Sequence, residues 1–465
     1  MENFYLNELI TATKGEFMSG DPHAPVKSIS IDTRTLAKDD YYIALKGANY
    51  DGYDFIKQAI EKKAAGLILS FDVLKLDSSI QAFPTFPSIV RVRDTNRAIC
   101  DIAAAYRRKW KMPVVAVTGS NGKTTTRDML ASILNLDGPT LSNKGNLNNQ
   151  IGVPLTLFNL GTLYNYAVIE IGTSWPGEIQ RLSEITAPDI GIITNIGFTH
   201  LENFKDREGV FKEKRMLVES LPQSGAAVLN ADDPFLREIK SGKEQITFGT
   251  AEGADVRAKN IRLWPDLPSF EMQLAGNNIH VRLPVYGKFN IYNALAAAAA
   301  AHKLGVSPEL IAKGIEQAAA PKWRMEKTQL LSGAIVINDA YNANPSSMKE
   351  SIENLVQSFP DREKTLVLGD MLELGEDAEK QHRELGRFIS SQPVSRVMLF
   401  GGLMEKAYDE LSSSDAHYFL KKEELAIEIK KHLNSDCVVL FKASRGMKFE
   451  EIVEAVLSSE ETIGR

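Results

Sequence analysis

Cysteine is scarce in this chain of 465 residues. Cys100 and Cys437 are its two cysteines, and they lie far apart, outside any metal-ligand spacing. A disulfide scaffold and a cysteine-based zinc site are therefore excluded. A reducing cytoplasm is expected instead, with both thiols buried as small hydrophobic groups.

Long apolar runs are missing as well. The longest, residues 294–301, is mostly alanine and falls well short of the ~20 apolar residues that a transmembrane helix needs. The first residues, Met1, Glu2 and Asn3, show neither the basic segment nor the apolar core of a signal peptide. We therefore expect a cytoplasmic protein that does not insert into membranes.

The chain also lacks an excess of basic charge. Its 54 Lys and Arg against 60 Asp and Glu give a net charge of −6, which argues against a large nucleic-acid footprint. With 43% hydrophobic and 25% charged residues the composition is globular, so disordered, collagen-like and coiled-coil chains are excluded. At roughly 150 residues per domain, the length predicts about three domains.

Three units can be distinguished along the chain. The first mixes β-like runs, 41–45 and 66–70, with a predicted helix over 54–65, and 82–87 with its two prolines is typical of a linker. Helical spacing follows over 95–109. We expect a small α/β N-terminal domain over residues 1–92.

Continuous apolar runs then alternate with helical segments, which is typical of parallel strands covered on both faces. In the central unit these runs are 114–117, 167–171, 190–194 and 226–229, and 246–284 alternates enough to predict an antiparallel extension. In the last unit they are 334–338, 365–368, 397–400 and 437–440. The sequence thus predicts an α/β protein with a central P-loop parallel sheet over 93–326 and a Rossmann-like doubly wound sheet over 327–465. No amphipathic seam indicates an interface with a second protein chain, so a monomer is expected.

A phosphate-binding loop is the strongest local signal. A buried strand ending near Val117 leads into the segment Thr118-Gly119-Ser120-Asn121-Gly122-Lys123-Thr124-Thr125-Thr126, and a helix is predicted to begin at Lys123. Glycines let backbone N–H groups face a phosphate, and the helix N-terminus adds the positive end of its dipole. Lys123 is expected to reach the β- and γ-phosphates and the Thr124 hydroxyl to bind Mg²⁺. Val117 stands where the standard motif has its first glycine, so this is a variant P-loop.

Polar residues follow the other predicted strands. Glu170 ends one strand and fits the magnesium carboxylate of a P-loop site, although it could also be an ordinary strand-end glutamate. His200 follows another strand and is either a metal ligand or a structural histidine. The asparagine-rich segments 145–152 and 339–345 are either capped loops or walls of a ligand site at the carboxyl edge of a sheet.

Together these motifs resemble the Mur ligases, the ATP-dependent amide-bond ligases of peptidoglycan precursor assembly and hence of cell-wall biogenesis. The P-loop, Glu170-Ile171-Gly172, the stretch 193–197 with His200-Leu201-Glu202, and the stretch 290–294 occur in the order of that family. Segments 339–348 and 368–375 resemble its D-alanyl-D-alanine-adding member. Segments 30–34 and 51–56 also match, with Tyr53 where histidine is common, so the resemblance spans residues 30–445.

The resemblance implies a two-step reaction. ATP phosphorylates the terminal carboxylate of UDP-N-acetylmuramoyl-tripeptide, and the amine of D-alanyl-D-alanine attacks the resulting acyl phosphate to give the pentapeptide precursor, ADP and phosphate. Alternatives are the tripeptide-forming Mur ligase and a folylpolyglutamate synthetase, both disfavoured by the string over 341–345. A non-catalytic P-loop nucleotide-binding module is an alternative from a different class.

The resemblance also implies roles for single residues. Two Mg²⁺ ions are implied, with Thr124 and Glu170 at the first, and His200 and a CO₂-modified (carbamylated) Lys214 at the second. The stretch around Lys214, with Lys212 two residues away, could otherwise be a solvated basic helix face. The implied catalytic groups are Lys123, Glu170, His200, Lys214 and Asn342, the last beside the acyl phosphate. The implied ATP contacts are Gly119, Ser120, Asn121, Gly122, Lys123, Thr124, Thr125, Asn290 and Asn293 at the adenine, Arg324 at the phosphates and Asp339 at the ribose. The implied contacts of the UDP-linked peptide are Ser30, Thr33, Arg34, Asn148, Asn149 and Thr173.

Overall fold

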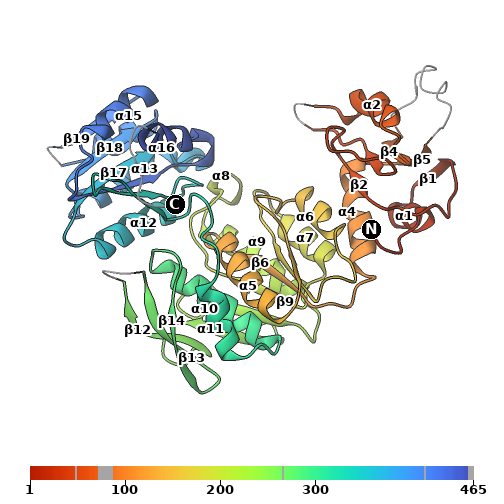
Figure 1. Cartoon of the computed structure of the whole chain (residues 1–465), viewed down its shortest axis with the longest axis horizontal. Helices are drawn as coiled ribbons and strands as arrows, with labels where there is room; N and C mark the ends of the chain where they lie inside the picture. The colour runs from red at the N-terminus through yellow and green to blue at the C-terminus, as the bar shows by residue number, and fades with distance from the viewer. Residues whose placement is uncertain (48–49, 72–86, 264–266, 413–414, 459–465) are drawn as a thin grey trace.

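The computed structural model describes residues 1–47, 50–71, 87–263, 267–412 and 415–458, and their strands form three sheets. In Figure 1 the N-terminal part (red and orange) and the C-terminal part (blue) rise on either side of the central part, leaving an open V. The predicted linker 82–87 lies, except for Pro87, outside the described residues.

The N-terminal sheet has five strands in the order β1-β5-β4-β3-β2. All its neighbouring strands are parallel except β1 and β5. The predicted helix 54–65 is shorter, because Asp51 caps a 3-10 turn over Gly52–Phe55 and the chain leaves the helix at Lys63, whose φ is 62°. The elements are α1 (Leu6–Thr13), β1 (Glu16–Ser19), β2 (Ile29–Ser30), β3 (Tyr41–Ile43), α2 (Ile56–Glu61), β4 (Gly66–Ser70) and β5 (Ser88–Val92).

The central sheet has nine strands in the order β14-β13-β12-β11-β10-β9-β6-β8-β7. The predicted antiparallel extension is confirmed for β12, β13 and β14, whereas β11 was assigned wrongly to it, because it pairs in parallel with both β10 and β12. The strands are β6 (Val114–Thr118), β7 (Thr140–Ser142), β8 (Tyr166–Glu170), β9 (Ile190–Ile193), β10 (Ala226–Asn230), β11 (Glu244–Gly249), β12 (Val256–Arg262), β13 (Ser269–Leu274) and β14 (Asn277–Arg282).

Helices cover both faces of the parallel part of this sheet, which explains its continuous apolar strands. Residues 294–301 are buried in α10, whose small side chains let the helix pack closely on α5 and the sheet. The helices are α4 (Thr95–Arg107), α5 (Lys123–Asp137), α6 (Gly152–Leu157), α7 (Glu178–Thr186), α8 (Leu201–Phe204), α9 (Arg207–Ser220), α10 (Phe289–Lys303) and α11 (Pro308–Glu316).

The C-terminal sheet has six strands in the order β15-β16-β20-β17-β18-β19, and only its edge strand β15 is antiparallel. Apolar clusters on both faces pack it against helices, which confirms the predicted doubly wound unit. The strands are β15 (Glu326–Gln329), β16 (Ile335–Asn338), β17 (Glu363–Gly369), β18 (Arg396–Phe400), β19 (Ala416–Phe419) and β20 (Cys437–Lys442). The helices are α12 (Pro345–Ser358), α13 (Ala378–Ser390), α14 (Met404–Tyr408), α15 (Lys422–Lys430) and α16 (Glu450–Leu457).

Two expectations from composition can be checked directly. Cys100 and Cys437 are both free and buried, as predicted. Across the part of the chain that the structure describes, no helix has the length and apolar character to cross a membrane.

Candidate active site

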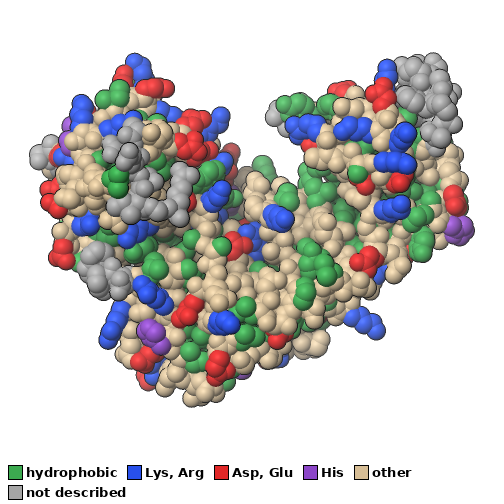
Figure 2. Space-filling model, viewed as in Figure 1, with side chains coloured by type: hydrophobic (Ala, Val, Ile, Leu, Met, Phe, Trp, Pro, Cys, Tyr) green, Lys and Arg blue, Asp and Glu red, His purple; other side chains and the backbone are tan. Residues whose placement is uncertain are grey.

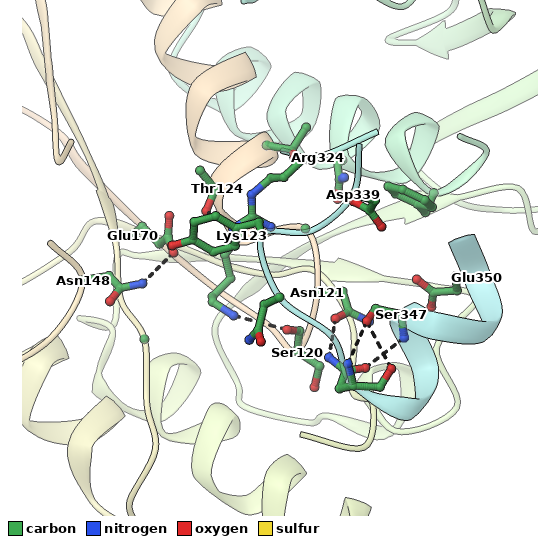
Figure 3. A pocket seen from close by; sticks show the side chains of 18 of the residues that line it. Ser120, Asn121, Lys123, Thr124, Asn148, Glu170, Arg324, Asp339, Ser347 and Glu350 are labelled. Atoms are coloured by element: carbon green, nitrogen blue, oxygen red, sulfur yellow. Dashed lines mark hydrogen bonds between the residues drawn. The ribbon is translucent and has the colours of Figure 1, made fainter. Parts of the chain in front are cut away.

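A polar cavity of about 260 Å³ lies between the central and C-terminal sheets. Its walls are the P-loop, the carboxyl end of β8, the loop that follows β16 and the first turns of α12 (Figure 3). Figure 2 shows the molecule hollowed between its N-terminal and C-terminal parts. Of the residues singled out from sequence, the cavity brings together Ser120, Asn121, Gly122, Lys123, Thr124, Thr125, Asn148, Glu170, Thr173, His200, Asn293, Arg324, Asp339 and Asn342.

The P-loop follows β6 and ends where α5 begins, as the sequence predicts. Gly122 precedes the helix with φ 81°, and a Cβ there would lie 2.1 Å from Asn293 Oδ1. Gly119, with φ 150°, lies against Thr194, the residue directly after β9, and a Cβ there would approach Thr194 Oγ1 to 1.8 Å. Both positions therefore require glycine, for conformation and for space.

Polar contacts to the segment that follows β9 fix the shape of the loop. The backbone N–H of Ser120 donates to the carbonyl oxygen of Asn195 at 3.0 Å, and that of Asn121 to Asn195 Oδ1 at 2.9 Å. The N–H of Gly197 donates to Ser120 Oγ at 2.8 Å. These contacts organise the loop before any ligand binds, so little ordering cost remains for binding.

Lys123 lies at the first position of α5. Its ammonium donates to the carbonyl oxygens of Gly119 at 2.8 Å and Ser120 at 3.2 Å. Burial lowers its pKa, and the positive charge of Arg324 lowers it further, while Glu170 opposes both effects. A buried cation beside a helix N-terminus is a site for an anion such as a phosphate.

Arg324 reaches this loop from the segment between the two sheets. Its Nη2 donates to Thr124 Oγ1 at 3.0 Å, and its guanidinium lies 4.0 Å above the ring of Tyr341. Tyr341 follows β16, so the stacked guanidinium links the central and C-terminal units at the cavity.

Glu170 ends β8 and is buried. Its Oε2 lies 3.1 Å from Arg127 Nη1, and its Oε1 accepts a hydrogen bond from Asn148 Nδ2 at 2.8 Å. Arg127 belongs to the second turn of α5. The carboxylate is thereby fixed in orientation, with one oxygen engaged by a cation and the other by an amide.

His200 and Lys214 differ in their surroundings. His200 borders the cavity, and its Nδ1 lies 2.6 Å from Glu373 Oε2 of the C-terminal unit, a contact that lowers the pKa of Glu373. Lys214 is buried on α9 and has no hydrogen-bond or ion-pair partner among the residues that the structure describes. Burial, with the charge of Lys123 adding, lowers the pKa of Lys214 far below its usual value, and Glu213 opposes the shift.

Strand ends of the C-terminal sheet supply the opposite wall. Asp339 follows β16 and pairs with Lys442 at the end of β20, Oδ2 to Nζ 2.6 Å. Lys442 also donates to the carbonyl oxygen of Asn342 at 3.1 Å. Asn342 Oδ1 accepts from the N–H of Ala343 at 2.9 Å.

Several residues singled out from sequence do not line this cavity. Asn290 donates to the carbonyl oxygen of Tyr286 at 2.6 Å and accepts from Asn293 Nδ2 at 2.8 Å. Asn149 Oδ1 accepts from Gly152 N–H at 2.9 Å, where α6 begins. The others are Gly119, Lys214, Ser30, Thr33 and Arg34.

The N-terminal residues form their own polar group on the five-stranded sheet. Arg34 pairs with Asp32, Nη2 to Oδ2 2.7 Å, and Ser30 Oγ donates to the carbonyl oxygen of Asp32 at 3.0 Å. Thr33 Oγ1 donates to Gln58 Oε1 at 2.5 Å. Asp32 thus orients the guanidinium toward solvent.

Sequence reasoning missed three polar groups of the cavity and its surroundings, namely Arg127, Glu350 and Lys442, whereas Asn344 belongs to the segment 339–345 that the sequence singled out. Asn344 Nδ2 donates to Asn121 Oδ1 at 2.9 Å, which ties α12 to the P-loop. Lys442 could have been found, because a lysine ending an apolar run on a parallel strand lies at the ligand-binding edge of the sheet. The other two, Arg127 and Glu350, carry no sequence signal of their own.

The fold and this cavity define a P-loop enzyme of three α/β units whose site is completed by the C-terminal unit. Family models agree: the Mur ligase middle domain matches residues 117–301, the Mur ligase glutamate ligase domain 323–445, and the Mur ligase family catalytic domain 25–107. The chain belongs to the Mur ligase family.

The relatives point to one branch. The chain is 36% identical to the UDP-N-acetylmuramoyl-tripeptide–D-alanyl-D-alanine ligase of Bacillus subtilis (strain 168), over 93% of this chain and 94% of that protein. Crystal structure I of MurF from Acinetobacter baumannii matches with a TM-score of 0.89 and 32% identity, over 98% of this chain and 99% of that one. MurF from Thermotoga maritima, solved in complex with ADP, matches with a TM-score of 0.81 and 27% identity, over 92% and 96%. The predicted fold class and family are confirmed.

Proposed function

We propose that this chain is an ATP-dependent, ADP-forming amide ligase that adds D-alanyl-D-alanine to UDP-N-acetylmuramoyl-tripeptide through an acyl phosphate. The observation that carries the proposal is the single cavity that joins the P-loop, Glu170 and the C-terminal strand ends. The substrates are those of the relatives, which are UDP-N-acetylmuramoyl-tripeptide–D-alanyl-D-alanine ligases.

Phosphoryl transfer depends mainly on positioning and on neutralising charge. The N–H groups at the start of α5 and the Lys123 ammonium would bind the β- and γ-phosphates, with Lys123 exchanging its loop carbonyls for phosphate oxygens. Arg324, already within hydrogen-bond distance of Thr124, would bind the same phosphates from the C-terminal side. Two positively charged side chains, those of Lys123 and Arg324, would thus bind the same triphosphate.

The side chains at this site fit Mg²⁺ ions whose remaining ligands are phosphate oxygens. The described residues contain no cluster of three His, Cys, Asp or Glu, but Mg²⁺ in phosphate sites usually needs one or two carboxylates only. Thr124 and Glu170 would hold a first ion and His200 a second. When bound, Mg²⁺ neutralises the repulsion between the acceptor carboxylate and the γ-phosphate.

The surroundings of Lys214 suit a carbamate on its side-chain nitrogen. Only a neutral amine takes up CO₂, and the lowered pKa of Lys214 favours that form. The carbamate oxygens would then add a ligand for the second ion, and Lys212, which is exposed and pairs with Glu208, has no such environment.

The remaining assignments follow the family resemblance. Asn293, with Asn290 bonded to it, would contact adenine, and Asn342 would lie beside the acyl phosphate. The UDP part would bind at Ser30, Thr33 and Arg34, of which only Arg34 is exposed, and the muramyl peptide would pass Asn148, Asn149 and Thr173. The corresponding domains are 1–92, 93–326 and 327–465. A monomer in the cytoplasm remains our prediction.

The test is phosphate release from ATP and Mg²⁺ with UDP-N-acetylmuramoyl-tripeptide, comparing D-alanyl-D-alanine with single amino acids. We expect turnover with the dipeptide and a product heavier by one dipeptide. Turnover with single amino acids alone would identify another ligase of the family. ATP binding without any turnover would favour a non-catalytic nucleotide-binding module.

A further inference from the structure

The loop after β17 meets the short helix α8 beside the cavity, at a contact between the C-terminal and central units. In Figure 1 α8 lies next to the C-terminal part. The backbone N–H of Glu202, on α8, donates to the carbonyl oxygen of Glu373 at 3.4 Å. Gly375 has a φ of 56°, and a Cβ there would lie 3.0 Å from the Cα of Glu202. The conformation and the close approach both favour glycine, so the two backbones meet at a defined point.

His200, which directly precedes α8, borders the cavity, and its two ring nitrogens have different surroundings. Nδ1 is buried without an aligned hydrogen bond, yet it lies only 2.6 Å from Glu373 Oε2. Two lone pairs at that distance would repel, so the contact requires the ring hydrogen on Nδ1. Nε2 has no hydrogen-bond or ion-pair partner within the described ranges. The ring also packs edge-on against Phe204, which limits its rotation.

The backbones on both sides of this contact are unusual. His200 has a φ of 51° and Glu373 a φ of 62°, and the left-handed region is uncommon for residues other than glycine. Such conformations persist where the surrounding structure enforces them, and they concentrate at functional sites. Within the C-terminal unit the N–H of Leu372 donates to Ser444 Oγ at 2.9 Å, which fixes the loop just before Glu373. The carboxylate is therefore presented to His200 by a held loop.

The hydrogen on one ring nitrogen decides what the other can do. A neutral imidazole has one N–H and one lone pair, and the partner of the N–H selects which nitrogen keeps the lone pair. Metal-binding histidines commonly donate their other N–H to a carboxylate, which fixes the ring and its tautomer. The Glu373 side chain is 60% exposed, so its pairing with His200 contributes little to stability. Its effect falls on the orientation of His200.

We propose that Glu373 is a positioning residue that holds His200 with Nε2 free for a divalent cation, so that the second cation site is complete only when the C-terminal unit docks on the central one. The inference rests on the proposed ATP-dependent function, which requires the cation. The central unit carries His200 and Lys214, but the group that orients His200 comes from the other unit.

The first test observes His200 itself, in the full chain without nucleotide or metal. ¹⁵N NMR of the seven histidine side chains is recorded at about pH 8, where an ordinary histidine is neutral, and His200 is the signal lost in His200→Gln. We expect hydrogen on Nδ1 and none on Nε2. In Glu373→Ala both neutral forms should appear, whereas Glu373→Gln keeps an acceptor oxygen and should resemble the unmodified protein. Glu376→Ala, an exposed glutamate three positions further on, is the matched control and should leave the signal unchanged.

The second test follows phosphate release as a function of Mg²⁺ concentration. Glu373→Ala should raise the concentration for half-maximal release about tenfold or more, as is typical when a carboxylate behind a metal-binding histidine is lost. His200→Gln should raise it at least as much. Adding Glu373→Ala to His200→Gln should then change little, because Glu373 acts through His200. Fully additive losses would contradict the positioning role.

The outcomes separate this inference from the proposed function. A His200 ring with hydrogen on Nε2 in the unmodified protein, or an unchanged signal in Glu373→Ala, overturns the inference and leaves the ligase proposal intact. An altered tautomer with an unchanged Mg²⁺ requirement also overturns it. Thermal unfolding of Glu373→Ala should match that of Glu376→Ala, and a clear loss of stability would contradict a role confined to orientation. Absence of phosphate release from the unmodified protein would instead refute the proposed function.

Discussion

The Lys123 ammonium donates to two carbonyl oxygens of its own loop and lies close to Arg324 and Glu170. Several charged groups in this cavity, Lys123 among them, therefore have partners from other segments of the chain, and each partner changes what the group can do. Glu170 is oriented by Arg127 and Asn148, whereas Glu350 has no partner within the described residues. Predictions at this scale concern single charges.

Lys123→Ala should lower the rate of phosphate release about 100-fold or more. The reason is that the charge that develops on the transferred phosphate loses a preorganised hydrogen-bond donor. The midpoint of thermal unfolding should shift by no more than a few degrees, since the buried ammonium has a desolvation cost that offsets its hydrogen bonds. Lys212→Ala removes an exposed lysine and is the control. Near-normal turnover in Lys123→Ala would refute the role of the P-loop.

His382 predicts a pH dependence of stability. It is fully buried on α13, its Nε2 accepts from the N–H of Met371 at 3.1 Å, and burial lowers its pKa from the usual 6.5. The unfolded chain therefore binds the proton more readily, so stability falls as pH drops below about 6.5, by at most ~1.4 kcal/mol per pH unit. Denaturant unfolding between pH 7.5 and 5.5 should show a steeper loss in the unmodified protein than in His382→Gln. Equal slopes would contradict this assignment.

The helices and parallel strands of the two large sheets follow from their sequence patterns, because continuous apolar runs and glycine loops are local signals. The short strands β7, β15 and β19 carry no such signal, since they are half-exposed and are stabilised only by pairing at a sheet edge. The predicted helix 54–65 is longer than the observed one for a related reason. A 3-10 turn capped by Asp51 precedes the observed helix, and the left-handed residue Lys63 follows it. Pairing and capping depend on geometry that periodicity does not report.

A matched pair of glycines tests the P-loop turn. Gly122 precedes α5 and Gly177 precedes α7, with φ of 81° and 87°. Alanine at either position should cost about 1 kcal/mol for the left-handed conformation. Only at Gly122 does the added Cβ meet a side chain, Asn293, so Gly122→Ala should cost about 1–3 kcal/mol more and weaken ATP binding. Denaturant unfolding and ATP titration check both variants, and equal losses would exclude the steric effect.

At the scale of the whole molecule, the three units are joined in different ways. One apolar cluster runs from Phe4 and Leu6 through α4 to the central sheet, so the N-terminal unit packs on the central one by hydrophobic contact. The central and C-terminal units meet through polar contacts, among them Asn121 with Asn344 and Thr124 with Arg324. Polar interfaces of this kind permit relative motion of domains more readily than apolar ones.

Calorimetry should therefore show unfolding that is not two-state, with a van't Hoff enthalpy below the calorimetric enthalpy. ADP at about 100 times its Kd should stabilise the nucleotide-binding units by ~2.7 kcal/mol and raise their transitions. Lys123→Ala should lose most of that shift. A single two-state transition would mean that the polar interface couples the units fully.

The sequence by itself determined the P-loop, the order of the βα units and membership of the Mur ligase family, because these depend on residues adjacent in the chain. Tertiary structure alone decided which polar groups are engaged. Asp339 is bonded to Lys442, more than a hundred positions away, whereas the carboxylate of Glu350 has no bonded partner among the residues that the structure describes. Hydrogen bonds and burial set the charge and the availability of a carboxylate, and both arise only when distant strand ends meet at one edge.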